Sequence, residues 1–408
     1  MSSGGAVDRL DLARGQRRVL GVGVIALAVC AIAAPASPTQ FFRAYLAAYL
    51  FYLGIALGSM VLLMAYHLTG GSWGLMIRRI LEAAMRTLPL LALLFLPIAY
   101  GVDYLYPWAQ PSLVAASPKL QYQQFYLQPK LFWIRAAVYF ALWIVMAFWL
   151  SRWSRQEDRT GNPRLAWKSQ QLSAFGAVIY GISLHFAAVD WAMSLQPVFH
   201  STIWGPLFAT GQLLSALAWA LLVLGCLIRR PLLDDVASLQ VRNDLGSLLL
   251  TLLILWAYMA WFQFMLVWIA NMPVDVVWYV PRTSPAWKGV MWAIFLLHFV
   301  IPFFLLLMRS VKRNSRAVAW IAGVILFMQL AFVYYLVMPQ PAAETLADHW
   351  MDFLTPLGIG GIWLACFLWQ LPRQPLLPLH DYNREAALHL RHLDQEEAAR
   401  EAVLSYEE

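Results

Sequence analysis

The sequence contains few charged residues and few cysteines. Asp, Glu, Lys and Arg make up only 12% of the 408 residues, whereas an ordinary soluble domain carries about 25%. The three cysteines, Cys30, Cys226 and Cys366, lie far apart in apolar stretches and form no CxxC or CxxCH motif. The composition therefore excludes an ordinary soluble domain, and the cysteines indicate no iron–sulfur cluster, structural zinc site or covalently attached haem.

The chain also lacks several motifs of common catalytic and cofactor sites. It contains no Gly-rich phosphate loop and no HExxH zinc motif. His185 and His298 are the only histidines in the middle of apolar runs, and a membrane haem b needs paired imidazoles at one depth. We therefore expect no redox cofactor in this chain and no catalysis by the chain alone.

Long apolar runs dominate the sequence instead. Hydrophobic residues make up 61% of the chain, and a membrane-spanning helix needs about 20 mostly apolar residues. The runs are continuous and rich in Leu, Ala and Trp, which favours helices over the alternating strands of a β-barrel. We predict an all-α integral membrane protein with ten spans, at about 19–35, 41–66, 87–104, 132–150, 172–195, 206–228, 245–269, 289–308, 317–337 and 353–371.

The basic residues alternate between the two sides of these spans. With the N-terminus placed in the cytoplasm, 23 of the 29 Lys and Arg fall in cytoplasmic segments, among them Arg78, Arg79 and Arg86. Basic residues favour cytoplasmic loops, so the net charge of +7 is a topology signal and does not indicate nucleic-acid binding. We expect both termini in the cytoplasm.

The runs also predict a domain organisation. A cytoplasmic segment, 1–18, precedes a membrane domain, 19–371, and a cytoplasmic tail with an amphipathic helix follows at 372–408. Flanking helices at 19–35 and 353–371 enclose two four-helix groups, 41–195 and 206–337, as in parallel repeats. Ala34-Pro35-Ala36 resembles a signal-peptidase site. The segment before the first span is long and contains Asp8 and Asp11, which favours an uncleaved first helix.

Ionisable side chains inside a span are costly, so each one is a functional hypothesis. Asp190 is the clearest example, because this carboxylate lies well inside an apolar run. We interpret it as a proton-path residue with a raised pKa, and His185, about 140° away around the helix, as a neighbour reached through water or a second helix. Further candidates for a proton path or a quinone-like pocket are Asp103, Tyr104, Arg135, Gln263, Asn271, Asp275 and His298.

Simpler structural interpretations compete with several of these functional ones. A lone His298 on an apolar helix is more often a hydrogen-bonded core residue, and Arg43 and Arg135 more often extend to the lipid headgroups. Glycines at helical spacing indicate close helix contacts, at Gly54 and Gly58 and again at Gly358, Gly360 and Gly361.

Several segments carry longer motifs that resemble one family. They are YHLTGGSWG (66–74), RRILEAA (78–84), TLPLL (87–91), VDWAMSL (189–195), STIWG (201–205), WIANMP (268–273), VMP (337–339), PLGIGG (356–361) and PLLPLHD (375–381). Together they resemble the ActF-type membrane subunits of bacterial alternative complex III, relatives of the NrfD polysulfide-reductase-type family. The motifs run from the second span to the start of the tail.

The resemblance implies a NrfD-like fold in a bacterial inner-membrane complex. Such a complex oxidises menaquinol or ubiquinol and passes electrons through iron–sulfur and haem c subunits to a cytochrome or terminal oxidase. A sister NrfD-like subunit is the expected quinol site, while ActF-type subunits serve assembly and proton translocation, with quinone and lipid as candidate ligands. One departure is visible: after Asn271-Met272-Pro273 the chain has Val274-Asp275 where the family pattern suggests an acidic pair.

A secondary transporter is the alternative interpretation. Transporters commonly have helices interrupted by Gly or Pro at matching places in both halves. Here the prolines lie mainly near span ends, for example Pro89, Pro97, Pro197 and Pro302. The residues alone do not separate the two interpretations, and the resemblance favours the respiratory subunit.

The charge alternation makes a topology prediction. In a cysteine-free background, single cysteines at 160 and 315 should be protected from a membrane-impermeant thiol reagent in intact cells, and those at 115 and 345 should be labelled. The reason is the excess of basic residues on the cytoplasmic side. Labelling of position 160 would contradict the topology.

Overall fold

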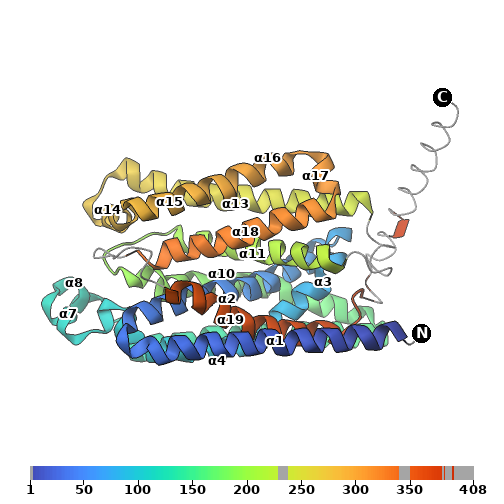
Figure 1. Ribbon diagram of the computed structural model, residues 1–408, viewed down its shortest axis with the longest axis horizontal. Helices are drawn as coiled ribbons and strands as arrows, with labels where there is room; N and C mark the ends of the chain where they lie inside the picture. The colour runs from blue at the N-terminus through green and yellow to red at the C-terminus, as the bar shows by residue number, and fades with distance from the viewer. Residues whose placement is uncertain (1–2, 228–237, 340–349, 379–380, 382–387, 390–408) are drawn as a thin grey trace.

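The computed structural model describes residues 3–227, 238–339, 350–378, 381 and 388–389, and these form an elongated bundle of helices (Figure 1). Ten helical segments in this part of the chain are long and apolar enough to cross a membrane. The prediction of an all-α integral membrane protein is confirmed. The amphipathic helix predicted in the tail, 372–408, lies largely outside the described residues.

Each of the ten spans overlaps one predicted run. They are α1 (Ser3–Ala33), α2 (Pro38–Thr69), α3 to α5 (Ser72–Met85, Leu88–Leu94, Leu96–Tyr100), α9 (Pro129–Thr160), α10 (Pro163–Trp191), α11 (Trp204–Leu227), α13 (Leu239–Ala270), α15 with η5 and α16 (Pro285–Ala293, Ile294–Val300, Ile301–Leu307), α18 (Ser315–Val337) and α19 (Trp350–Gln370). Several helices are longer than the predicted apolar runs and end at a turn. Between α9 and α10, Gly161 is left-handed (φ 61°), Asn162 caps α10, and Pro163 begins it.

The connections sort to the two ends of the bundle. The end that we call the charged end holds the N-terminal end of α1, the turns at Gly70–Gly71 and Gly161–Asn162, and α17 (Arg309–Arg313). The opposite, aromatic end holds α6 (Val102–Leu105), α7 (Pro111–Ala116), α8 (Pro118–Gln123), α14 (Pro273–Tyr279) and η4 (Val280–Thr283). This sorting agrees with ten spans, while the side of the membrane that each end faces stays a prediction.

Helix α2 lies at the centre of the bundle. Its most apolar stretch is 89% buried, against 17% for that of α1, and it packs against α3, α10, α11, α18 and α19. A Cβ on Gly58 would come within 2.1 Å of the Gln212 carbonyl oxygen, so only glycine allows α11 to approach this closely. The close contact predicted from Gly54 and Gly58 is confirmed.

Helix α1 flanks the bundle and packs mainly on α19. A Cβ on Gly361 would lie 2.6 Å from the Gly23 Cα, and one on Gly358 would lie 2.6 Å from Leu27. Gly358 and Gly361 therefore allow α1 and α19 to pack closely. The division into two four-helix groups stays a prediction.

Two spans are irregular in ways that the apolar runs did not predict. The third is broken between α3 and α4 and again before α5, because Pro89 and Pro97 lack the amide hydrogen that a continuous helix needs. At the first break, Trp363 Nε1 donates to Thr87 Oγ1 at 2.9 Å. The eighth span contains a π-helical turn, η5, just before Pro302.

Candidate functional site

Asp190 lies near the aromatic end of α10 in a buried ion pair with Arg135 of α9. The Asp190 side chain is fully buried. Arg135 donates from Nε to Oδ2 at 2.8 Å and from Nη2 to Oδ1 at 2.9 Å. The Tyr139 hydroxyl donates to Oδ2 at 2.9 Å. The interpretation of Arg135 as a headgroup contact is therefore wrong, because its guanidinium points into the protein and donates two hydrogen bonds to the Asp190 carboxylate.

Arg135 is itself held by the loop before α9. Its guanidinium lies 3.9 Å from the Tyr126 ring centroid, and Nη1 donates to the Tyr126 carbonyl at 3.0 Å. Burial, followed by the nearby Asp190 carboxylate, raises the pKa of Tyr126 to about 12, so this phenol stays protonated at neutral pH. The cluster, Asp190 with Arg135, Tyr139 and Tyr126, thus contains one carboxylate, one cation and two neutral phenols.

Aromatic side chains enclose the next residue, Trp191. Its ring lies 4.9 Å from that of Phe95 and 5.7 Å from that of Phe140, between ring centroids. The Tyr106 hydroxyl donates to the Trp191 carbonyl at 3.0 Å. The Trp191 ring also lies 5.9 Å from that of Tyr139, so this aromatic group adjoins the fully buried Asp190 carboxylate, where a low local dielectric strengthens the ion pair.

The structure does not gather the other predicted residues around Asp190. His185 is half-buried, and a Cβ on Gly205 of α11 would come within 2.3 Å of its Nδ1, so it faces the α11 backbone. Gln263 is buried and accepts a hydrogen bond from Ser201. Four others lie at the aromatic end: Asp103 and Tyr104 are exposed on α6, Asn271 ends α13 with φ 45°, and Asp275 is half-buried in the first turn of α14.

His298 is fully buried in the π-helical turn η5. Its ring centroid lies 4.0 Å from that of Trp256, and neither ring nitrogen has a hydrogen-bond partner among the described residues. The hydrogen bond expected of a core histidine is therefore not found among the described residues. π-helical turns are frequent at functional sites, so His298 stays a candidate that stands apart from Asp190.

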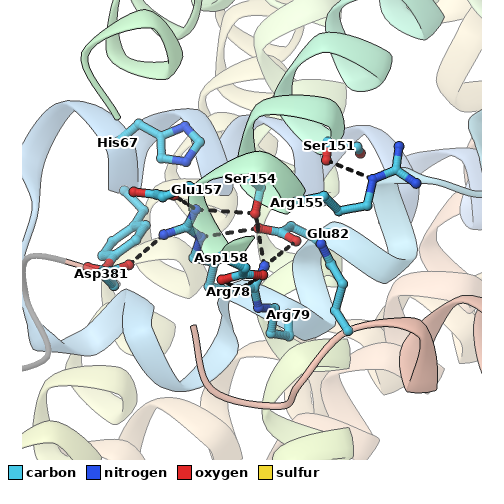
Figure 2. Close-up of polar contacts among 12 residues, drawn as sticks. His67, Arg78, Arg79, Glu82, Ser151, Ser154, Arg155, Glu157, Asp158 and Asp381 are labelled. Atoms are coloured by element: carbon cyan, nitrogen blue, oxygen red, sulfur yellow. Dashed lines mark hydrogen bonds and ion pairs between the residues drawn. The ribbon is translucent and has the colours of Figure 1, made fainter. Parts of the chain in front are cut away.

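A larger charge cluster lies at the charged end (Figure 2), where the sequence indicated only loop charges. Glu82 of α3 is fully buried and contacts three arginines: Arg78 at 3.1 Å, Arg79 at 2.9 Å and Arg86 at 3.1 Å. The Ser154 hydroxyl of α9 also donates to its Oε1 at 2.7 Å. One carboxylate thus stabilises three cations.

Acidic groups from two other segments complete this network. Arg78 Nη2 lies 2.6 Å from Glu157, and Arg79 Nη2 lies 2.5 Å from Asp158, both at the end of α9. Arg78 Nη1 lies 2.6 Å from Asp381, which also accepts a hydrogen bond from the Tyr66 hydroxyl at 2.8 Å. Figure 2 shows these side chains pointing toward one another. The network therefore connects α2, α3, α9 and the start of the tail.

Sequence reasoning counted these arginines as a topology signal and overlooked their partners. A local signal was present, since Arg78, Glu82 and Arg86 are spaced at i, i+4 and i+8 and so share one helix face. Arg282 of η4 is likewise buried: it donates to the carbonyls of Tyr335 at 3.0 Å and Leu336 at 2.7 Å at the end of α18. Burial lowers its pKa to about 9.

No group of three or more His, Cys, Asp or Glu in the described residues could hold a metal ion. Comparison with models of protein families and with curated proteins gave no match. The structure thus places two charge clusters at opposite ends of the bundle, and each cluster connects separate helices through ion pairs.

The Asp190–Arg135 pair can be tested with a double-mutant cycle. Asp190→Asn and Arg135→Gln should each lower the thermal unfolding midpoint in detergent, because each leaves an uncompensated charge. The double variant should recover part of the loss, with a coupling energy of about 1–3 kcal/mol. Additive effects of the two substitutions would contradict a direct interaction.

Glu82→Gln should be among the most destabilising single substitutions in the protein. It removes the carboxylate that Arg78, Arg79 and Arg86 share, and with it the only carboxylate that Arg86 contacts among the described residues. The loss should cost about 3–5 kcal/mol, as breaking a buried ion pair does. Thermal unfolding in detergent measures this. Asp103→Asn, which removes an exposed carboxylate, is the matched control and should change stability by no more than about 0.5 kcal/mol. Equal unfolding midpoints for the two variants would refute the central role of Glu82.

Proposed function

We propose that this chain is an integral membrane subunit of a bacterial respiratory quinol oxidoreductase of the alternative complex III type. In this proposal a sister NrfD-like subunit oxidises quinol, and iron–sulfur and haem c subunits carry the electrons to a cytochrome or terminal oxidase. The chain itself contributes to assembly and to a proton path, and it holds no redox cofactor of its own.

The observation that carries the proposal is the meeting of distant motif segments. The motifs at 66–74, 78–84 and 375–381 resemble the ActF-type subunits, and the network joins Tyr66, Arg78, Glu82 and Asp381 from these segments. Three motifs that were identified only by their resemblance to the ActF-type subunits thus contribute side chains to one buried cluster. This is what we expect if the motifs describe one functional unit.

The two charge clusters also fit the role proposed for the subunit. Moving a proton through a bundle requires ionisable or polar groups away from lipid, and charged groups in spans mark such routes. The Asp190 cluster lies near the aromatic end, and the Glu82 network lies at the charged end. In both clusters the carboxylates are ion-paired, so proton uptake requires an ion pair to open.

The spans also give reasons against a secondary transporter. Transporters built from repeats have broken helices at corresponding places in each half. The broken span is the third of the chain, which is the second helix of the first predicted group. The span with the π-helical turn is the eighth of the chain, which is the third helix of the second predicted group. The irregular spans therefore do not correspond.

Purification from a bacterium that makes the chain from its own chromosome tests this proposal. A tagged chain isolated in mild detergent should bring haem c and iron–sulfur proteins with it, seen in the absorbance spectrum and by mass spectrometry. The same chain expressed without partners should show no haem absorbance. A stable chain isolated with neither kind of partner would contradict the proposal and favour the transporter.

A further inference from the structure

A small cavity lies in the middle of the bundle, where α2, α11 and α18 meet. Its walls are mostly apolar and include Leu50, Phe208 and Phe332. Three polar side chains also line it: Gln212 and Ser215 from α11 and Gln329 from α18. Each of the three is at least 93% buried, so the cavity is a polar site inside the apolar core.

These polar groups have hydrogen-bonding capacity that the surrounding helices do not use. Gln329 Oε1 is buried and has no partner among the described residues. Gln212 Oε1 accepts a hydrogen bond from the Tyr180 hydroxyl of α10 at 2.8 Å, which leaves the amide Nε2 of Gln212 as its donor. The Ser215 hydroxyl donates to the Gly211 carbonyl at 2.7 Å and can still accept a hydrogen bond.

The size of the cavity decides what it can hold. The space that it leaves for the centres of water molecules is about 20 Å³, which is enough for one ordered water. Water is stable in a protein cavity when two to four polar groups bind it, and Gln212, Ser215 and Gln329 satisfy this requirement.

We propose that this cavity is a structural water site that links the amides of Gln212 and Gln329. The water accepts from Gln212 Nε2, donates to Gln329 Oε1, and can donate its second hydrogen to Ser215 Oγ. With the Tyr180 hydrogen bond, it completes a polar connection from α10 through α11 to α18. The inference rests on the cavity and its polar groups and does not depend on the proposed function.

Two glycines that line the cavity leave space for its glutamine side chains. Gly211 lines the cavity, and a Cβ on this residue would come within 2.6 Å of Gln329 Nε2. Gly54 of α2 also lines it, and a Cβ there would lie 3.2 Å from the Gln212 side chain. Small residues thus leave room for both glutamine side chains next to the cavity.

Two glutamine-to-leucine substitutions test the water site, because the direction in which each one shifts the thermal unfolding midpoint depends on whether water is bound. Gln329→Leu keeps a similar volume but removes the amide. If water binds there, this variant should lower the thermal unfolding midpoint by about 2 °C, because hydrogen bonds to the water are lost. Gln263→Leu is the comparison, since Gln263 is equally buried at 4% exposure but is bonded directly to Ser201.

A rise in the unfolding midpoint for Gln329→Leu, together with a fall for Gln263→Leu, would overturn the proposal. That pattern is expected of a dry cavity, in which the Gln329 amide is unpaired and leucine relieves its cost. A fall in both variants supports the water site.

A cryo-electron microscopy map of the unmodified protein, at a resolution that shows ordered water, tests the site independently of any variant. We expect a compact density peak about 2.7–3.2 Å from polar atoms of both Gln212 and Gln329. Elongated density from lipid or detergent, or no density between the two amides, would overturn the proposal.

Discussion

The charged end of this protein depends on the neutralisation of buried arginine charge by Glu82. Its carboxylate is fully buried and lies within 3.1 Å of nitrogens of Arg78, Arg79 and Arg86. A buried charge is tolerated only when it is paired and hydrogen-bonded. The position of α3 is therefore tied to the acidic residues of α9 and to Asp381 in the tail. Segments that are far apart in sequence are joined there because none of these charges is stable alone.

The middle and the aromatic end use different means to join helices. In the middle, glycines bring α2 and α11 into backbone contact, since a membrane offers little hydrophobic force between helices and close packing takes its place. At the aromatic end a single bidentate pair, Arg135 with Asp190, connects α9 to α10. Between the clusters lie neutral amides and His298, whose ring nitrogens have no partner among the described residues. We therefore expect function at the polar and charged side chains that are buried inside the bundle.

The apolar runs predicted all ten spans, because a length of about 20 apolar residues is a local property of sequence. The predicted run at 87–104 does not include the start of the third span at Ser72, because the charged residues of α3 are typical of a loop. The sequence indicates both Asp190 and Arg135 as candidates, but it does not predict that they pair across 55 residues, and the competing interpretation placed Arg135 at the headgroups. The contact between Arg78 and Asp381 spans 303 residues. Pairs this distant depend on helix packing, which local patterns do not encode.

The claim that the charge network holds the charged end together is tested most directly by hydrogen–deuterium exchange on the whole chain in lipid nanodiscs. The account predicts slow exchange in α3 and in residues 371–378, and faster exchange in both segments when Asp381→Asn removes one contact of Arg78. Exchange in α3 should not change with Asp103→Asn, at the opposite end. Unprotected amides at 371–378 in the unmodified protein, or unchanged α3 exchange in the Asp381 variant, would contradict the account.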